Sequence, residues 1–150
     1  MKGRRLQLSG EIRLPEGIEA PDLILSEGLV FWARLGAATW DDASAELTEA
    51  FEKSREASRN EDSIVYIVSN DALLGRTGPA DAMVAAGLVS AARTAAIEGW
   101  KKGWTANVVA FDDGHDPVLV LDRAVSLLED GVVTGELVHI GPGHLGKALV

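Results

Sequence analysis

The sequence contains no cysteine, which excludes disulfide bridges and thiol chemistry. A chain without disulfides fits a reducing compartment, and we expect it in the cytoplasm. Its stability must then come from a hydrophobic core. With 47% hydrophobic residues, 150 positions suffice for one domain over residues 1–150 and leave little room for a second.

Basic residues are also scarce, with 14 Lys and Arg against 23 Asp and Glu and a formal net charge of −9. Nucleic acids and anionic membranes are bound through clustered positive charge, so we expect neither as a partner. No long hydrophobic run stands out either. The best candidate, residues 84–97, is rich in alanine and contains Arg93, and we interpret it as a buried or interface helix.

A strand–helix–strand pattern lies between residues 63 and 111. Residues 64–68 are short, β-branched and apolar without alternation, which is typical of a parallel strand buried on both faces. Residues 80–102 are good helix formers, and Gly103 follows them where a C-terminal cap is expected. Residues 106–111 form a second apolar run. The pattern predicts one βαβ unit.

Two more helices and a last strand are predicted. One helix covers about residues 40–59, with Asp41 or Asp42 as its N-cap. The other opens at Pro117 and ends at Gly131, and residues 132–140 form the last strand. The apolar stripe expected on the second helix consists of Val118, Leu121, Val125 and Leu128.

The N-terminal segment has a different pattern. Apolar residues alternate with polar ones around a Ser9-Gly10 turn, which predicts one or two short strands. Residues 23–25 read as a short buried strand. The alternating apolar residues are Leu6, Leu8, Ile12 and Leu14.

These segments, in this order, resemble the short-chain dehydrogenase/reductase family. Residues 64–69 resemble the family's strand that ends in the catalytic serine, and Gly75-Arg-Thr-Gly-Pro79 resembles the loop after it. Thr105-Ala-Asn-Val-Val-Ala110 resembles the following strand. Glu46-Leu-Thr-Glu-Ala-Phe51 and Val133-Thr-Gly-Glu-Leu-Val138 resemble a helix and the last strand on either side. The resemblance implies an α/β fold, a partial Rossmann-like three-layer domain with a mostly parallel sheet and flanking helices.

The catalytic positions depart from the family pattern. Carried over residue by residue, the family's catalytic Asn, Ser, Tyr and Lys fall on Glu46, Ser69, Asp81 and Ala85. In the family, the Lys lowers the pKa of the Tyr so that the phenol exchanges a proton as hydride moves. Here only the serine is retained, and Ala85 has no charge with which to tune a neighbour. The resemblance therefore implies a degenerate member with no confident catalytic residue.

The nucleotide-binding half of the family domain also lacks a match. Residues 23–25 resemble the family's fourth strand, and no glycine-rich phosphate turn stands before them, so we expect no cofactor. A formal G-x-G-x-x-G from Gly141 to Gly146 has only four residues after it, and we interpret it as spurious. Residues 1–20 match nothing in the family. We predict that residues 4–14 cover the sheet edge that the missing half would otherwise cover.

Other polar residues each have a structural interpretation beside a functional one. Asp112, Asp113, His115 and Asp116 offer metal ligands in no known spacing, so a solvated turn is favoured and no metal site is predicted. His139 is interpreted as a packing or surface residue. Ser69, with Asn70 and Asp71, could hold a small molecule at a strand end or cap its own loop. Glu46 and Asp81 could form a carboxylate pair, although exposed surface charge is favoured.

The resemblance also implies docking surfaces. The family assembles through the two long helices that correspond to residues 40–59 and 80–102, and at a second interface through its last helix and strand. We predict a non-catalytic subunit that assembles with itself or with a full-length short-chain dehydrogenase. The alternative is a divergent enzyme or small-molecule-binding protein acting without nicotinamide, which requires a cleft where Ser69 and Asp81 converge. The expected interface residues are Leu47, Phe51, Ala82, Ala85, Ala86, Val89, Arg93 and Ala96.

Overall fold

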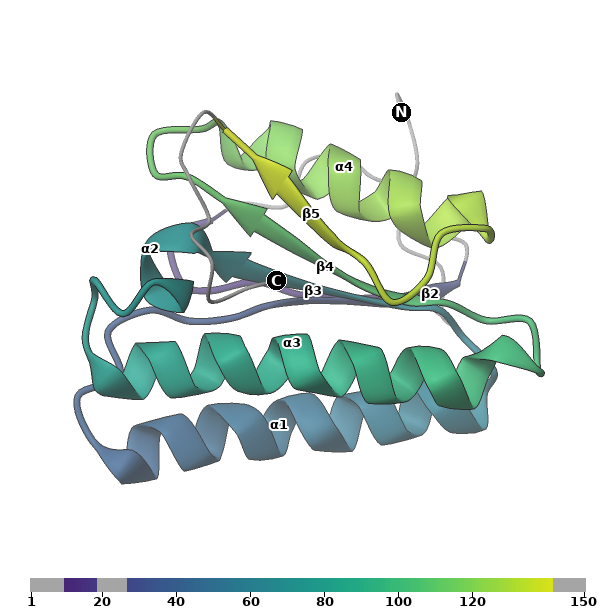
Figure 1. Cartoon of the computed structure of the whole chain (residues 1–150), viewed down its shortest axis with the longest axis horizontal. Helices are drawn as coiled ribbons and strands as arrows, with labels where there is room; N and C mark the ends of the chain where they lie inside the picture. Colours follow the sequence, from purple (N-terminus) through teal and green to yellow (C-terminus); the bar gives the residue numbers. More distant parts are fainter. Residues whose placement is uncertain (1–9, 19–26, 142–150) are drawn as a thin grey trace.

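The computed structural model describes residues 10–18 and 27–141, which form a three-layer α/β domain (Figure 1). Its sheet has five parallel strands, which lie side by side in the order β1-β2-β3-β4-β5. This architecture confirms the predicted fold class. The strands are β1 (Gly10–Arg13), β2 (Gly28–Trp32), β3 (Ile64–Ser69), β4 (Ala106–Phe111) and β5 (Leu137–Ile140).

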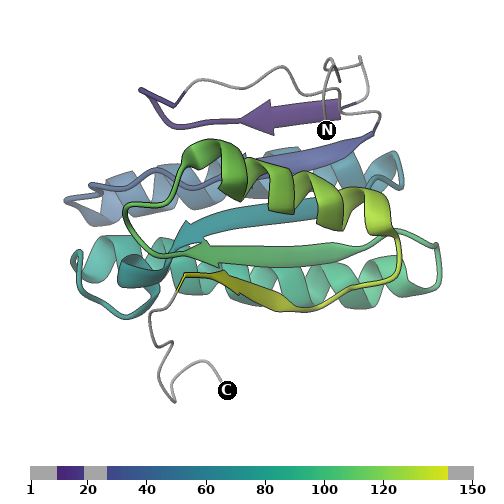
Figure 2. The same ribbon diagram turned by 90° about the horizontal axis from the view of Figure 1, so that it is seen from above.

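The helices cover both faces of the sheet. Helices α1 (Trp40–Arg59) and α3 (Pro79–Trp100) lie side by side on one face, and α4 (Pro117–Asp130) lies on the other (Figure 1). The short α2 (Asn70–Leu73) follows β3 directly. Figure 2 shows that successive crossovers from β2 onward step across the sheet in one direction. Because α4 lies on the opposite face from α1 and α3, the β4–α4–β5 crossover has the opposite hand, an uncommon arrangement.

The sheet separates two apolar clusters. Phe31 and Tyr66 point toward α1 and α3, where Leu88 is fully buried against them. On the other face, Val30 and Ile67 pack against Leu121 of α4. Burial on both faces accounts for the uninterrupted apolar runs of the central strands, as predicted for β3 and β4.

The predicted bounds of α1 and β4 are confirmed, but the N-cap of α1 is Thr39, not Asp41 or Asp42. Thr39 Oγ1 accepts a hydrogen bond from the Asp42 N–H at 3.2 Å, and the Asp42 carboxylate accepts one from the Thr39 N–H at 3.2 Å. This reciprocal pair is a capping box. Hydrogen bonds from the backbone N–H of Ala38, the Thr39 hydroxyl and the backbone N–H of Thr39 lower the pKa of Asp42.

The buried stripe of α4 also differs from the predicted one. Val118 is about half exposed in the first turn, and Val120 is fully buried in its place. Residues 117–119 form the turn that follows the N-cap Asp116, and the inward face begins only at Val120. The last strand is shorter than predicted, because residues 132–136 form a loop that the Asn107 side chain holds through two hydrogen bonds.

The strand next to β3 lies further along the chain than predicted. It is β2, whereas the sequence pattern placed it at residues 23–25, which lie outside the described residues. Gly28 begins β2 with φ +113°, and a Cβ there would lie 2.9 Å from the Ser63 carbonyl oxygen. Such a close approach requires glycine.

At the sheet edge, residues 10–13 pair with β2, where residues 4–14 were expected. Gly10 lies in a strand, not in the predicted turn. Leu6, Leu8 and residues 142–146 of the G-x-G-x-x-G lie outside the described residues.

Helix α3 is the one described helix that is long and apolar enough to span a bilayer, by length and composition only. It packs along the sheet beside α1, as expected of a core helix (Figure 1). Near its C-terminal end, Gly99 lies against the buried Trp104. A Cβ on Gly99 would lie 2.4 Å from the Trp104 carbonyl oxygen and 2.6 Å from its ring.

Gly99→Ala should therefore destabilise the protein by about 2 kcal/mol, because the added methyl displaces Trp104. Helix propensity alone predicts the opposite, a gain of roughly 1 kcal/mol. Urea denaturation followed by circular dichroism measures the change. Gly87→Ala in the same helix is the matched control, since its Cβ meets only the flexible end of Leu47. Equal stability changes in the two variants would contradict this packing.

Candidate functional site

The sequence resemblance assigns the family's four catalytic positions to Glu46, Ser69, Asp81 and Ala85. Of these, Glu46, Ser69 and Asp81 lie at the carboxyl ends of β2 and β3 or at the loop after β2. Glu46 lies on α1 with only 6% of its surface exposed. Its carboxylate accepts hydrogen bonds from the Arg13 guanidinium, at 3.1 Å from Nη1 and in a second contact from Nη2. It also accepts a hydrogen bond from the Arg34 N–H at 2.6 Å. Glu46 is therefore engaged in a buried ion pair.

Arg13 is held on several sides. Its guanidinium donates a hydrogen bond to the Trp32 carbonyl oxygen at 2.6 Å and lies 4.4 Å from the centre of the Phe31 ring. Its Nη2 lies 2.6 Å from Oε2 of Glu49, one turn after Glu46. A single cation from β1 thus joins two carboxylates of α1 to the backbone of β2.

Asp81, in the first turn of α3, is also buried. Its carboxylate accepts hydrogen bonds from the Gly36 N–H at 3.1 Å and the Ala37 N–H at 2.9 Å. These amides belong to the loop between β2 and α1, and Glu46 binds the Arg34 N–H of the same loop. The interpretation of Glu46 and Asp81 as exposed surface charge is therefore wrong, because both carboxylates are buried and hold one loop from two sides.

Ser69 and Ala85 complete the set. Ser69 is the N-cap of α2, and its Oγ accepts a hydrogen bond from the Ala72 N–H at 3.4 Å. Ala85 packs in the core beneath the sheet. The structure thus brings Glu46 and Asp81 to the same loop, whereas the Ser69 hydroxyl binds the backbone of α2.

A second polar cluster lies where β3, β4 and β5 end. Asp112 Oδ1 accepts a hydrogen bond from Asn70 Nδ2 at 2.9 Å and lies 3.1 Å from His139 Nε2. Asn70 is almost fully buried, and its Oδ1 has no hydrogen-bond partner. The His139 side chain is half-buried and lies in hydrogen-bond contact with Asp112. The two residues are 27 positions apart, so no local sequence pattern indicates this contact.

Carboxylates gather beside this cluster. Partial burial and the neighbouring carboxylates of Asp71 and Asp112 raise the pKa of Asp113. Arg76 pairs with Asp71 at 3.1 Å. Within residues 10–18 and 27–141, no three His, Asp or Glu side chains are placed to hold a metal ion.

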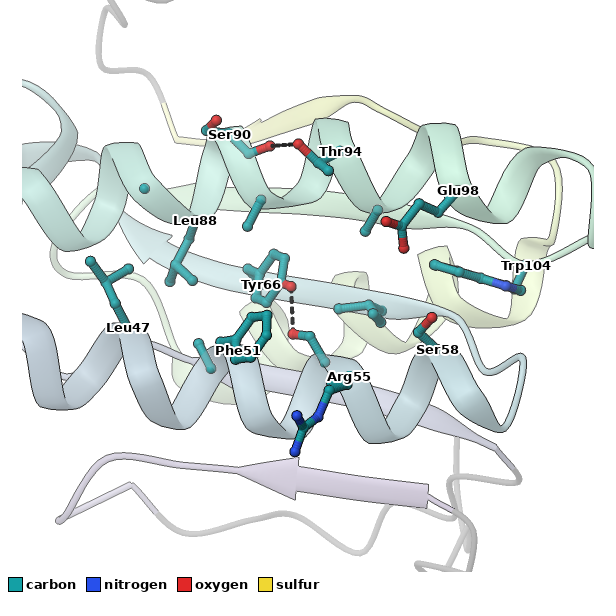
Figure 3. A pocket seen from close by; sticks show the side chains of 16 residues that line it. Leu47, Phe51, Arg55, Ser58, Tyr66, Leu88, Ser90, Thr94, Glu98 and Trp104 are labelled. Carbon is teal, nitrogen blue, oxygen red and sulfur yellow. Dashed lines mark hydrogen bonds between the residues drawn. The ribbon is translucent and has the colours of Figure 1, made fainter.

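Apart from these clusters, an apolar groove of about 500 Å³ lies between α1 and α3. Figure 3 shows its sides, with Leu47, Phe51 and Arg55 on α1 and Ser90, Thr94 and Glu98 on α3. On its floor, the Ser54 and Tyr66 hydroxyls lie 2.6 Å apart in a hydrogen bond. Burial raises the pKa of Tyr66, so this hydroxyl stays protonated at neutral pH.

The expected interface residues divide into two groups. Ala85, Val89 and Ala96 are buried in the chain's own core and are not available to a partner. Phe51, in contrast, is 62% exposed. Five of the expected interface residues remain at least partly exposed, and two of these, Leu47 and Phe51, line the groove. The five are Leu47, Phe51, Ala82, Ala86 and Arg93.

Several solved structures of short-chain dehydrogenases share this fold. A short-chain dehydrogenase from Mycobacterium smegmatis has a TM-score of 0.64 and 23% identity, over 77% of this chain and 58% of that protein. An oxidoreductase of the short-chain dehydrogenase/reductase family from Burkholderia thailandensis has a TM-score of 0.62 and 23% identity, over 75% of this chain and 61% of that protein. The chain thus spans about three fifths of their length and shares their fold.

No family model matches the sequence, and no curated protein matches it. The similarity to solved structures therefore establishes the fold, and function has to be argued from the residues themselves.

Glu46→Ala should lower the free energy of unfolding by about 3 kcal/mol, because it leaves the buried Arg13 with an incomplete set of partners. Chemical denaturation at pH 7 measures the change. Glu52→Ala, at an exposed position on the same helix, should shift stability by less than about 0.5 kcal/mol. A similarly small effect at Glu46 would show that the ion pair is not a structural requirement.

Asp113→Asn should stabilise the protein at pH 7, and by less as the pH falls toward 4. The raised folded-state pKa means that the ionised form is disfavoured in the fold. This cost is present above the folded-state pKa and is absent below the unfolded value near 4. Denaturation midpoints at the two pH values test the sign, with Asp122→Asn on α4 as control. A destabilised Asp113→Asn variant at pH 7 would contradict the assignment.

Proposed function

We propose that this chain is a non-catalytic protein with the short-chain dehydrogenase/reductase fold, which assembles through α1 and α3 with a second copy or with a full-length short-chain dehydrogenase. The main support for the proposal is that the side chains at the positions assigned to the family's catalytic residues make contacts within the fold. Glu46 binds Arg13, Asp81 binds loop amides and Ser69 caps α2. Proton exchange with a substrate would need one of these groups free and facing a cleft.

The turn after β1 supports a role without a dinucleotide. In a doubly wound sheet, the strand that carries the phosphate-binding turn lies beside the fourth strand, and β1 has this position beside β2. Its turn contains Pro15, which has no N–H to donate, and Glu16, which adds negative charge. The Ile18 N–H is directed to the Pro15 carbonyl oxygen at 3.3 Å. A pyrophosphate needs the opposite, several free N–H groups at a helix start.

The surface of α1 and α3 supports assembly. Aromatic and aliphatic side chains are exposed along both helices, including Phe51 on α1 and Met83 on α3. A groove lined mainly by apolar atoms runs between them (Figure 3). Helix α3 is apolar on its outer face as well as its inner one, and a helix of this kind is usually covered by another element. Exposed apolar patches of this kind mark interaction sites.

The alternative of a divergent enzyme needs Ser69 and Asp81 to converge in one cleft. The Ser69 hydroxyl faces the first turn of α2, and the Asp81 carboxylate faces the loop after β2. Neither residue lines the groove between α1 and α3 or the hollow of about 510 Å³ beside Arg34 and Glu46. The geometry therefore favours the non-catalytic reading.

Equilibrium dialysis of the purified chain against NADH and NADPH tests the proposal. We expect no saturable binding up to about 1 mM nucleotide, which corresponds to less than about 4 kcal/mol of binding free energy. A full-length short-chain dehydrogenase measured in parallel is the control. Stoichiometric, saturable binding of either nucleotide would overturn the proposal.

A further inference from the structure

A hollow of about 550 Å³ opens at the amino end of the sheet, the opposite edge from the polar clusters described above. The strands β2, β3 and β4 are in register there, so the segments that precede them lie side by side. Acidic side chains dominate the lining, and none of the described residues that line it is basic. The acidic residues are Glu27 before β2, Glu61 and Asp62 before β3, and Glu129 near the end of α4.

Two of these acidic residues are unfavourable for the fold itself. Glu61 has φ +57° and is the one non-glycine residue with a positive φ in the described part of the chain. Glycine adopts this left-handed conformation without strain. Asp62 is 7% exposed, and burial together with the neighbouring Glu27 carboxylate raises its pKa. Stability does not explain either side chain, whereas a bound cation would.

A buried hydrogen-bond donor borders the same hollow. Trp104 lines it with only 2% of its surface exposed, and its Nε1 has no hydrogen-bond partner among the described residues. An indole nitrogen only donates, and a buried donor without an acceptor costs stability. The ring also borders the groove between α1 and α3, and Figure 3 shows its nitrogen on the side away from Phe51. The N–H is therefore directed toward the hollow, where an acceptor oxygen would satisfy it.

The carboxylates and the donor together define the chemistry of a ligand. Within the described ranges 10–18 and 27–141, no three His, Asp or Glu side chains are placed to hold a metal ion. Carboxylates spread over a hollow suit an organic cation instead, because an ammonium or guanidinium group donates in several directions. A polyamine has no acceptor for the Trp104 N–H. A peptide with Arg or Lys supplies both groups, the cation on its side chain and the acceptor as a backbone carbonyl.

We infer that this hollow binds a basic peptide segment of a partner protein, with an Arg or Lys side chain on the carboxylates of Glu27, Glu61 and Asp62. A backbone carbonyl of the same segment accepts a hydrogen bond from Trp104 Nε1. The inference goes beyond the proposed function, since the hollow lies at the end of the sheet and not on the outer face of α1 and α3. The formal net charge of −9 also attracts a basic partner before contact.

Fluorescence anisotropy with a fluorescein-labelled Gly-Arg-Gly-Arg-Gly peptide tests the inference on the full chain. We expect saturable binding with a Kd of about 50 μM at about 150 mM salt. Glu61→Gly should weaken binding about tenfold and leave the urea midpoint unchanged or raised, because glycine relieves the positive φ. Asp41→Asn is the matched control. It removes an exposed carboxylate at the other end of α1 and should leave the affinity unchanged.

The indole N–H signal of Trp104 tests the second contact. The chain has four tryptophans, and single Trp→Phe substitutions assign their signals in a ¹H–¹⁵N spectrum. Saturation with the peptide should shift the Trp104 signal, because the donor gains an acceptor. Spermidine, which carries cations but no carbonyl, should leave this signal in place and bind about tenfold more weakly than the peptide.

Absence of saturable binding would overturn the inference, as would equal affinities of Glu61→Gly and Asp41→Asn for the peptide. Spermidine that binds as tightly as the peptide would show that the hollow takes cations without an acceptor. Binding that appears only after Lys2, Arg4 and Arg5 are replaced by Gln would show that the chain's own N-terminal segment is the occupant, and the partner assigned here would be wrong. None of these results bears on the proposed function, which the nucleotide dialysis tests separately.

Discussion

The buried ion pair between Arg13 and Glu46 is the contact on which the arrangement of the first half of the domain depends. It joins β1 to α1, two elements that are 33 positions apart in sequence at this point, and places a cation against the Phe31 ring. Glu46 also binds the loop after β2, and Asp81 holds the same loop from α3. A buried charge needs its partner, so these contacts constrain the loop and the start of both helices.

This constraint links the fold to the proposed function. The Asp81 carboxylate accepts hydrogen bonds from the loop after β2, and Ser69 caps α2. A buried side chain that is engaged in hydrogen bonds within the fold is poorly placed to exchange a proton with a substrate. Meanwhile, α1 and α3 keep an exposed apolar groove on the outside of the domain. The proposed assembly rests on this groove and on the exposed apolar side chains beside it.

Much of the central fold was predictable from the sequence. The strands β3 and β4 are short, uninterrupted apolar runs, α3 is a long run of good helix formers, and α4 has an apolar stripe between Pro117 and Gly131. The strand β2 was misplaced, since residues 23–25 form a short apolar run a few positions before it. The Arg13–Glu46 pair was missed because no local pattern relates a residue on a strand to one on a distant helix. Helix α3 is apolar nearly all round, so its sequence could not show that Val89 and Ala96 point inward.

The measurement that tests the central claim most directly is native mass spectrometry of the tagged chain, isolated from its own cells without denaturation. The account predicts a defined complex that contains a second protein chain, either another copy or a full-length short-chain dehydrogenase, with no dinucleotide held by this chain. A single chain that carries a bound nicotinamide dinucleotide would contradict both the assembly and the non-catalytic role.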